Sequence, residues 1–255
     1  MGANEMAVTA ESRKVCEKHG EYEVRAYEVL GKVFRSTHCP QCLDEQEAAR
    51  KAEEATQQAE RVRRAWEAKI GSAGIPERFQ SRTLASYAPS FDGQRRALAF
   101  AQAYVEGFEG NPGRGALFLG LPGTGKTHLA VGIALELMRQ GHAAMFCTVM
   151  RAVRTVKETW RRDAEQSEAE AIRALVFPDL LILDEVGVQF GSEAEKLILF
   201  DVLNERYERC KATILLSNLT ATEVKDYLGE RVMDRMREDG GKVVVFDWES
   251  YRGRA

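Results

Sequence analysis

The residues best suited to chemistry lie between Gly120 and Thr127, where the sequence reads Gly-Leu-Pro-Gly-Thr-Gly-Lys-Thr. This is the pattern of a phosphate-binding loop, G-x-x-x-x-G-K-[ST]. Glycines let backbone N–H groups close around a phosphate chain, while Lys126 would reach the β and γ phosphates and the Thr127 hydroxyl would help hold Mg²⁺. The residues expected at the nucleotide are Gly120, Pro122, Gly123, Thr124, Gly125, Lys126, Thr127 and His128.

Two acids follow an apolar run further along the chain. Leu180–Leu183 leads directly into Asp184 and Glu185. A carboxylate at a strand tip beside the loop can hold Mg²⁺, and the next carboxylate can orient or deprotonate the attacking water. We therefore predict Asp184 as the magnesium residue, together with Thr127, and Glu185 as the base. The next apolar run ends at Asn218, which could position the water or sense the γ-phosphate, although an Asn at such a place is more often a helix cap or a turn residue.

The elements that must position these residues alternate between helix and strand. A short apolar run before the loop and helical spacing after it argue against a glycine-rich turn that matches by chance. The alternation predicts an α/β fold with a mainly parallel sheet covered by helices on both faces, and a ligand site at the carboxyl ends of the strands. Expected helices are 94–108, one from about 126, a helical region at 150–175, 193–209 and one from about 222; expected strands are 116–119, 143–149, 180–183, 213–217 and 243–246.

The amino-terminal stretch carries a second set of reactive side chains. Cys16 and His19 form a C-x₂-H pair, and Cys39 and Cys42 form a C-x₂-C pair, which together could complete a tetrahedral structural Zn²⁺ site. His38 is a further histidine that could take the place of one of these ligands. The alternative interpretation is that the three thiols and the histidine are unrelated and bind no metal. Residues 22–24 and 33–34 suggest two strands of a zinc ribbon around a glycine turn, residues 1–12 are expected to be loose, and Cys147 and Cys210 are expected to be buried.

Three domains are expected from these patterns. Residues 1–43 form the zinc module. Residues 44–74 form a helical connector that docks through Val62, Trp66 and Ile70, and residues 75–255 form the nucleotide-binding domain. Because the net charge is −3, any contact with nucleic acid must come from a local patch. The sequence has no apolar run long enough for a membrane span and no signal-peptide core, so we expect a cytoplasmic protein whose five cysteines bind metal or are buried.

Two late segments, Leu228–Arg237 and Phe246–Arg252, join the nucleotide motifs in a resemblance to the DnaC/DnaI bacterial helicase loaders, which are AAA+ ATPases. The resemblance covers the chain from about Ile75 and is nearest to the DnaC type, whereas the zinc pairs look more like DnaI-type or phage-encoded loaders. It implies that Asn218 is sensor 1 and that Arg252 is sensor 2. It also implies that Arg235, or else Arg231, is an arginine finger reaching ATP on a neighbouring subunit, so that the active form is an oligomer.

The resemblance further implies contacts with single-stranded DNA on the helix after the second strand. Arg151, Arg154, Lys157, Arg161 and Arg162 fall on one side of a helical wheel. Trp160 occupies the position of a base-stacking aromatic, although on the wheel it falls with core valines and could equally pack inside. Ser192 matches a further contact position. Binding is expected to be weak, salt-sensitive and independent of sequence.

The function expected from this resemblance is ATP-dependent loading of a hexameric DnaB-type replicative helicase onto single-stranded DNA, with slow, partner-stimulated ATP hydrolysis. The cofactors implied are ATP, Mg²⁺ and Zn²⁺. Two alternatives stay open. One is an IstB-type transposition helper acting on duplex DNA, and the other is an adaptor gated by nucleotide without significant hydrolysis.

Overall fold

The computed structural model describes residues 8–29, 32–35, 38–187 and 192–251. It divides into two compact units, residues 1–66 and residues 67–255. Of the residues singled out above, Arg252 lies outside the described residues, as do the side chains of Val62, Trp66 and Ile70. No helix in the described ranges is long and apolar enough to cross a membrane.

The first unit contains a three-stranded antiparallel sheet and most of one long helix. The strands are β1 (Val8–Cys16), β2 (Gly20–Val29) and β3 (Lys32–Arg35), in the order β1-β2-β3. The two strands expected on either side of the glycine turn are confirmed. The expectation of a loose amino terminus is wrong for residues 8–12, because this segment pairs with β2, with Ser12 opposite Val24. Cross-strand hydrogen bonds satisfy its backbone groups.

Helix α1 (Pro40–Ser72) begins directly after Cys39, four residues before the expected start of the connector helix. Its composition of Glu, Ala, Gln, Arg and Lys favours helix, and exposed pairs such as Lys51–Glu47 at 2.8 Å join successive turns. Its last turn belongs to the second unit, where Lys69 donates to the Met138 carbonyl at 2.6 Å. Gly74 ends the segment with a φ of 70°, and a Cβ there would lie 2.6 Å from the Phe146 carbonyl oxygen.

The second unit is built on a five-stranded parallel sheet, as predicted. Its strands are β4 (Ala116–Gly120), β5 (Ala144–Thr148), β6 (Leu180–Asp184), β7 (Ala212–Ser217) and β8 (Lys242–Phe246), in the order β5-β6-β7-β4-β8. Every residue of β7 is buried, as expected of a central strand covered on both faces. Parallel pairing brings the carboxyl ends of all five strands to one edge of the sheet.

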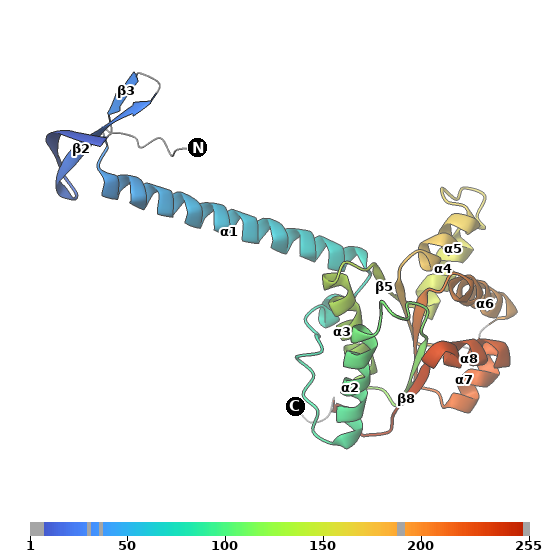
Figure 1. The fold of residues 1–255 in the computed structure, drawn as a ribbon. Coiled ribbons are helices and arrows are strands. Elements are labelled where there is room, and N and C mark those ends of the chain that lie inside the picture. Colours follow the sequence, from blue (N-terminus) through green and yellow to red (C-terminus); the bar gives the residue numbers. More distant parts are fainter. Residues whose placement is uncertain (1–7, 30–31, 36–37, 188–191, 252–255) are drawn as a thin grey trace, which may run out of the picture. The chain divides into compact units, whose positions relative to one another are not determined.

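Helices cover both faces of this sheet (Figure 1). Helices α2 (Asp92–Glu106) and α3 (Lys126–Arg139) lie on one face, and α4, α5, α6, α7 and α8 lie on the other. The bounds of this second group are α4 (Val149–Glu158), α5 (Glu168–Val176), α6 (Glu193–Glu208), α7 (Ala221–Leu228) and α8 (Glu230–Arg237). Short 3₁₀ turns occupy Glu77–Phe79 and Glu238–Gly240.

The region expected to be helical from Met150 to Leu175 is two helices. Helix α4 ends at Glu158, and α5 starts after Ser167, whose hydroxyl accepts from the Glu170 backbone N–H while the Glu170 carboxylate bonds back. This capping box provides a strong local start for a second helix. Arg161 and Arg162 therefore lie between the helices, and their place on the α4 wheel was wrong. Cys147 is buried as expected, whereas Cys210 is exposed, which corrects the expectation for that thiol.

Candidate nucleotide-binding site

The strand order gathers the predicted nucleotide residues at one edge of the sheet. Strand β7 lies between β4 and β6, with Leu119 of β4 opposite Ser217 of β7. The phosphate loop follows β4, Asp184 ends β6, and Asn218 comes directly after β7. Residues from three distant parts of the chain thus meet where parallel sheets bind ligands.

Lys126 is the centre of this group, with only 6% of its surface exposed. Its ammonium donates to the carbonyl oxygens of Gly120 at 2.6 Å and Leu121 at 2.9 Å, and to Oδ1 of Asn218 at 3.0 Å. Thr220, and not Asn218, caps helix α7, so the alternative role as a helix cap does not apply to Asn218. The structure therefore brings the loop lysine and the strand-tip amide into direct contact.

Thr127 and Asp184 form the neighbouring pair of oxygen ligands. The Thr127 hydroxyl donates to Oδ2 of Asp184 at 3.1 Å. Burial raises the pKa of Asp184, while hydrogen bonds from the Glu185 N–H and Thr127 and the charge of Lys126 oppose that shift. A hydroxyl beside a partly buried carboxylate is the kind of donor set that Mg²⁺ takes next to phosphate oxygens, so these two residues fit the ion.

Glu185 has an uncommon backbone conformation. Its φ of 63° lies in the left-handed region, which side-chain-bearing residues rarely adopt, and its N–H donates to Oδ1 of Asp184 at 2.7 Å. Strained conformations of this kind cluster at functional sites. Glu185 is exposed, so its carboxylate is open to solvent just after the end of β6.

His128, counted among the nucleotide residues, bonds to the chain that precedes α2. Its Nε2 lies 3.0 Å from the Thr83 carbonyl oxygen and 3.1 Å from the Ser86 hydroxyl. Burial lowers the pKa of His128, which favours a neutral ring. Its ring stands edge-on to Tyr87, and Tyr87 also packs on the loop, since a Cβ on Gly125 would lie 2.9 Å from its ring. These contacts anchor the loop helix to residues 83–87.

Two residues after β8 contact the phosphate loop directly. In the sequence they stood out only as part of the family resemblance. The indole N–H of Trp248 donates to the Thr124 carbonyl at 2.8 Å, and the backbone N–H of Tyr251 donates to the Gly123 carbonyl at 2.9 Å. Both residues lie in the segment Phe246–Arg252, which carries part of the family resemblance, and that was the available signal in the sequence. No spacing rule connects them with the phosphate loop, which lies more than a hundred positions earlier.

The candidate arginine fingers both lie on α8 and bond within their own unit. Arg235 donates to Oδ1 of Asn204 and stands over the Tyr207 ring, 4.5 Å from its centroid. Arg231 lies 5.9 Å from the centroid of Phe200. Neither of these contacts involves the phosphate loop of the same chain.

The four predicted zinc ligands come together in the first unit. The ligand atoms of Cys16, His19, Cys39 and Cys42 all lie within 4.8 Å of one another. Nδ1 of His19 lies 3.8, 3.7 and 3.3 Å from the sulfurs of Cys16, Cys39 and Cys42. Ligand atoms around a tetrahedral zinc ion stand roughly 3.5 to 3.8 Å apart, so this set fits zinc. No role falls to His38 in this cluster.

Electrostatics around the cluster also suit a metal. Backbone N–H groups of Lys18 and His19 lower the pKa of Cys16 to about 6, and thiolate is the form that binds zinc. Glu45, which sequence reasoning missed, accepts from Nε2 of His19 at 3.1 Å. A carboxylate on the far nitrogen fixes the tautomer that offers Nδ1 to a metal. The available signal was its place one helical turn after Cys42.

The predicted DNA contacts occupy an exposed part of the second unit. Arg154 is exposed on α4, whereas Lys157 pairs with Glu195 at 3.0 Å. Trp160 lies beyond the end of α4 with 52% of its surface exposed, outside the core, and its indole donates to Glu168 at 2.7 Å. Arg161 pairs with Asp163 at 3.2 Å. Ser192 is exposed at the start of α6.

Comparison with known proteins places these features in a family context. The family model described as "IstB-like ATP binding protein" matches residues 52–255. Replicative helicase loader DnaC of Escherichia coli (strain K12) is 39% identical over 182 residues, covering 71% of this chain and 74% of the relative. The same loader from Buchnera aphidicola subsp. Schizaphis graminum is 36% identical over 183 residues, covering 72% and 74%.

Solved structures show the same fold. The crystal structure of the DnaC helicase loader superposes with a TM-score of 0.60 at 24% identity, covering 67% of this chain and 99% of that one. The crystal structure of DnaI gives a TM-score of 0.56 at 22% identity, covering 69% and 93%. The second unit therefore has the fold of these two proteins, with the parallel sheet flanked by helices that the sequence predicted.

Proposed function

The chain belongs to the family of IstB-like ATP-binding proteins that includes the DnaC helicase loaders, and we propose that it is an ATP-dependent loader of a replicative DNA helicase. The observation that carries this proposal is the 39% identity to a named helicase loader over 182 residues, a stretch that covers most of the second unit. The gathering of Lys126, Asn218, Thr127 and Asp184 at the sheet edge supports the nucleotide dependence.

ATP binds, in this proposal, through the loop and the groups just behind it. Loop N–H groups and Lys126 bind the phosphates, and Lys126 exchanges its bonds to two loop carbonyls for bonds to phosphate oxygens. Thr127 and Asp184 hold Mg²⁺, which when bound neutralises charge on the phosphates. Asn218 stays next to Lys126 and so is placed to sense the γ-phosphate.

Hydrolysis then falls to the exposed carboxylate of Glu185. It takes the proton of the attacking water, and Asn218 orients that water. Arg235 or Arg231 of a neighbouring copy supplies positive charge to the transition state, and Arg252 acts as sensor 2. Slow turnover that partners stimulate suits ATP used as a switch. A Glu185→Gln variant that turns over ATP like the wild type would favour the adaptor without hydrolysis.

The remaining parts have roles in partner binding. The first unit, organised by zinc on Cys16, His19, Cys39 and Cys42, binds a hexameric DnaB-type helicase. Single-stranded DNA binds along α4 and the turn after it, through Arg154, Lys157, Trp160, Arg161 and Ser192. The exposure of Trp160 supports base stacking there. No part of the proposal involves a membrane.

The IstB-type transposition helper remains the second candidate, favoured by the description of the matching family model. The two functions differ in their DNA substrate. Filter binding with single-stranded and duplex oligonucleotides of equal length, with ATP present, separates them. Tighter binding to duplex would favour the transposition helper, and tighter binding to single strands would favour the loader.

The partner experiment is gel filtration with light scattering on a mixture with a DnaB-type hexamer, with and without ATP. The matched variants are a chain of residues 67–255 and the full chain carrying Cys42→Ser. A complex formed by the full chain and lost in both variants would support the loader and the zinc module as its helicase-binding part. Absence of a complex in every nucleotide state would refute the pairing.

A further inference from the structure

The segment after β8 lies along the phosphate loop. Strand β8 pairs in parallel with β4, with Phe246 opposite Gly120, so the two segments leave the sheet side by side. A Cβ on Gly120 would lie 2.2 Å from the Phe246 carbonyl oxygen, which shows how close the two backbones are. Beyond this point Trp248 and Tyr251 donate to the carbonyl oxygens of Thr124 and Gly123.

These two bonds act on consecutive peptide units of the loop. In a trans peptide the C=O and the following N–H point in opposite directions. A carbonyl of Gly123 held toward Tyr251 turns the N–H of Thr124 away from that segment, and a carbonyl of Thr124 held toward Trp248 does the same for the N–H of Gly125. A phosphate loop binds its anion with such N–H groups. The carboxyl-terminal segment thus sets the direction of two of the loop's donors from outside.

Packing holds the indole of Trp248 firmly in this position. Only 8% of the residue is exposed, and its ring lies 5.5 Å from the Phe91 ring and 4.9 Å from the Phe246 ring, centroid to centroid. Gly93 leaves the room it needs, since a Cβ there would approach the indole to 3.1 Å. Tyr251, in contrast, bonds through its backbone and its side chain is 66% exposed. Trp248 is therefore the side chain that fixes the segment to the loop.

We propose that Trp248 is a positioning residue for nucleotide binding, which acts by orienting the Thr124–Gly125 peptide so that its N–H faces the phosphates. The inference rests on the proposed nucleotide site and adds a residue to it. It also means that residues 247–251 and the phosphate loop are coupled through the bond from Trp248 to Thr124.

The test measures binding of mant-ADP with magnesium to the full-length protein by fluorescence. Trp248→Phe keeps a ring between Phe91 and Phe246 but removes the donor, and one lost hydrogen bond is expected to raise Kd about three- to tenfold. Phe91→Leu is the matched control, because it disturbs the same packing and leaves the donor in place. Its Kd should stay within about twofold of wild type even where its melting temperature falls. In steady-state ATP hydrolysis, Trp248→Phe should raise KM and leave kcat nearly unchanged.

Equal Kd values for wild type and Trp248→Phe, or equal losses in Trp248→Phe and Phe91→Leu, would overturn the inference. Failure of the wild type to bind mant-ADP would instead overturn the nucleotide site itself. If Trp248→Phe does not fold, the double variant Trp66→Phe, Trp160→Phe leaves Trp248 as the sole indole. A change in its emission on adding ADP supports the coupling, and an unchanged spectrum refutes it.

Discussion

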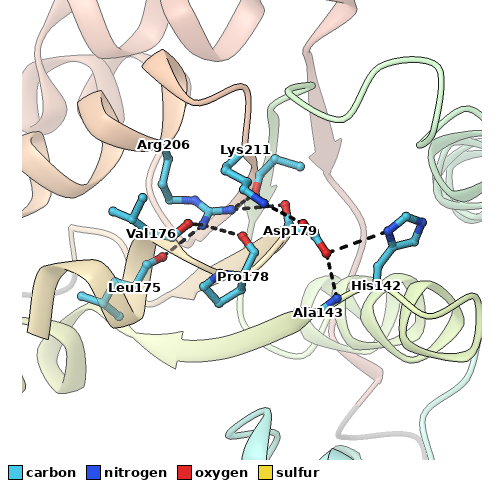
Figure 2. Close-up of polar contacts among 9 residues, drawn as sticks. His142, Ala143, Leu175, Val176, Pro178, Asp179, Arg206 and Lys211 are labelled. Carbon is cyan, nitrogen blue, oxygen red and sulfur yellow. Dashed lines mark hydrogen bonds and ion pairs between the residues drawn. The ribbon is translucent and has the colours of Figure 1, made fainter. Parts of the chain in front are cut away.

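Arg206 offers the sharpest test of the fold that carries the nucleotide site. It is fully buried in α6, and its guanidinium bonds to backbone at the ends of three elements (Figure 2). Nη1 donates to the carbonyl oxygens of Leu175, Val176 and Pro178 at 3.0, 2.9 and 2.9 Å. The other nitrogens donate to the carbonyls of Asp179 and Ala212 and to the Thr213 hydroxyl. The side chain thus joins the end of α5 to the starts of β6 and β7.

The expected loss follows from the three carbonyls on Nη1. The last carbonyls of a helix have no intrahelical partner, so removing Arg206 leaves buried acceptors unsatisfied at about 1–3 kcal/mol each. Burial lowers the pKa of Arg206 to about 9, so the group is charged at neutral pH and its removal recovers some desolvation free energy. We therefore expect Arg206→Met to lower the free energy of unfolding by about 3–5 kcal/mol. This lies near the lower end of the combined cost of the three unsatisfied carbonyls.

The assay is urea unfolding followed by circular dichroism. With an m-value of roughly 3 kcal/mol/M, the midpoint should fall by about 1–1.7 M. Arg209→Met is the control, because Arg209 is exposed at the C-cap of the same helix and pairs with Glu205 at 2.8 Å, and its change should stay within about 0.5 kcal/mol. Arg206→Lys tests geometry against charge, since one ammonium cannot reach acceptors spread across a planar fork.

The reasoning fails if Arg206→Met loses less than about 1 kcal/mol, because then the carbonyls find other partners at no cost. It also fails if Arg206→Lys is as stable as wild type. Either result would mean that Asp179, which accepts from Lys211 at 2.7 Å and from the Ala143 N–H at 2.9 Å, holds this junction without the arginine (Figure 2).

Three further predictions concern the sites. Because burial raises the pKa of Asp184, the folded carboxyl binds more protons than the unfolded one, so its contribution to stability declines as pH rises through its ordinary range. Asp184→Asn should therefore raise the melting temperature at pH 7, and the gain should be smaller at about pH 4. The same variant should lose magnesium-dependent ATP hydrolysis. A melting temperature below that of the wild type at pH 7 would contradict the reasoning. Elemental analysis should find about one zinc ion per chain in the wild type and in Cys210→Ser but not in Cys42→Ser, and equal zinc in the two variants would refute the proposed zinc site. Trp160→Ala should weaken binding to single-stranded DNA by about 1–3 kcal/mol, measured by fluorescence anisotropy. Phe177→Ala is the control, because it removes another exposed aromatic side chain. Equal affinities of the wild type and Trp160→Ala would exclude stacking.

Local patterns in the sequence identified much of this protein. The five parallel strands followed from short apolar runs separated by helical spacing, and the cluster of three cysteines and one histidine followed from two C-x₂ pairs. Local patterns misled in two places, for different reasons. Ser167 and Glu170 start a new helix inside a stretch whose composition favours one continuous helix. Residues 8–12 form a strand because β2 offers a pairing edge, which no periodicity within the segment reveals.

The sequence by itself determined which chemistry is present. A phosphate-loop motif, a pair of acids and thiols with metal-ligand spacing are each defined by neighbours within a few positions, so their spacing is readable along the chain. Only the tertiary structure decided which of these groups meet. The order β5-β6-β7-β4-β8 brings Asn218 to Lys126 and Asp184 to Thr127, and β8 brings Trp248 to Thr124. The order of strands in a sheet is set by packing among distant segments, and spacing along the chain does not encode it.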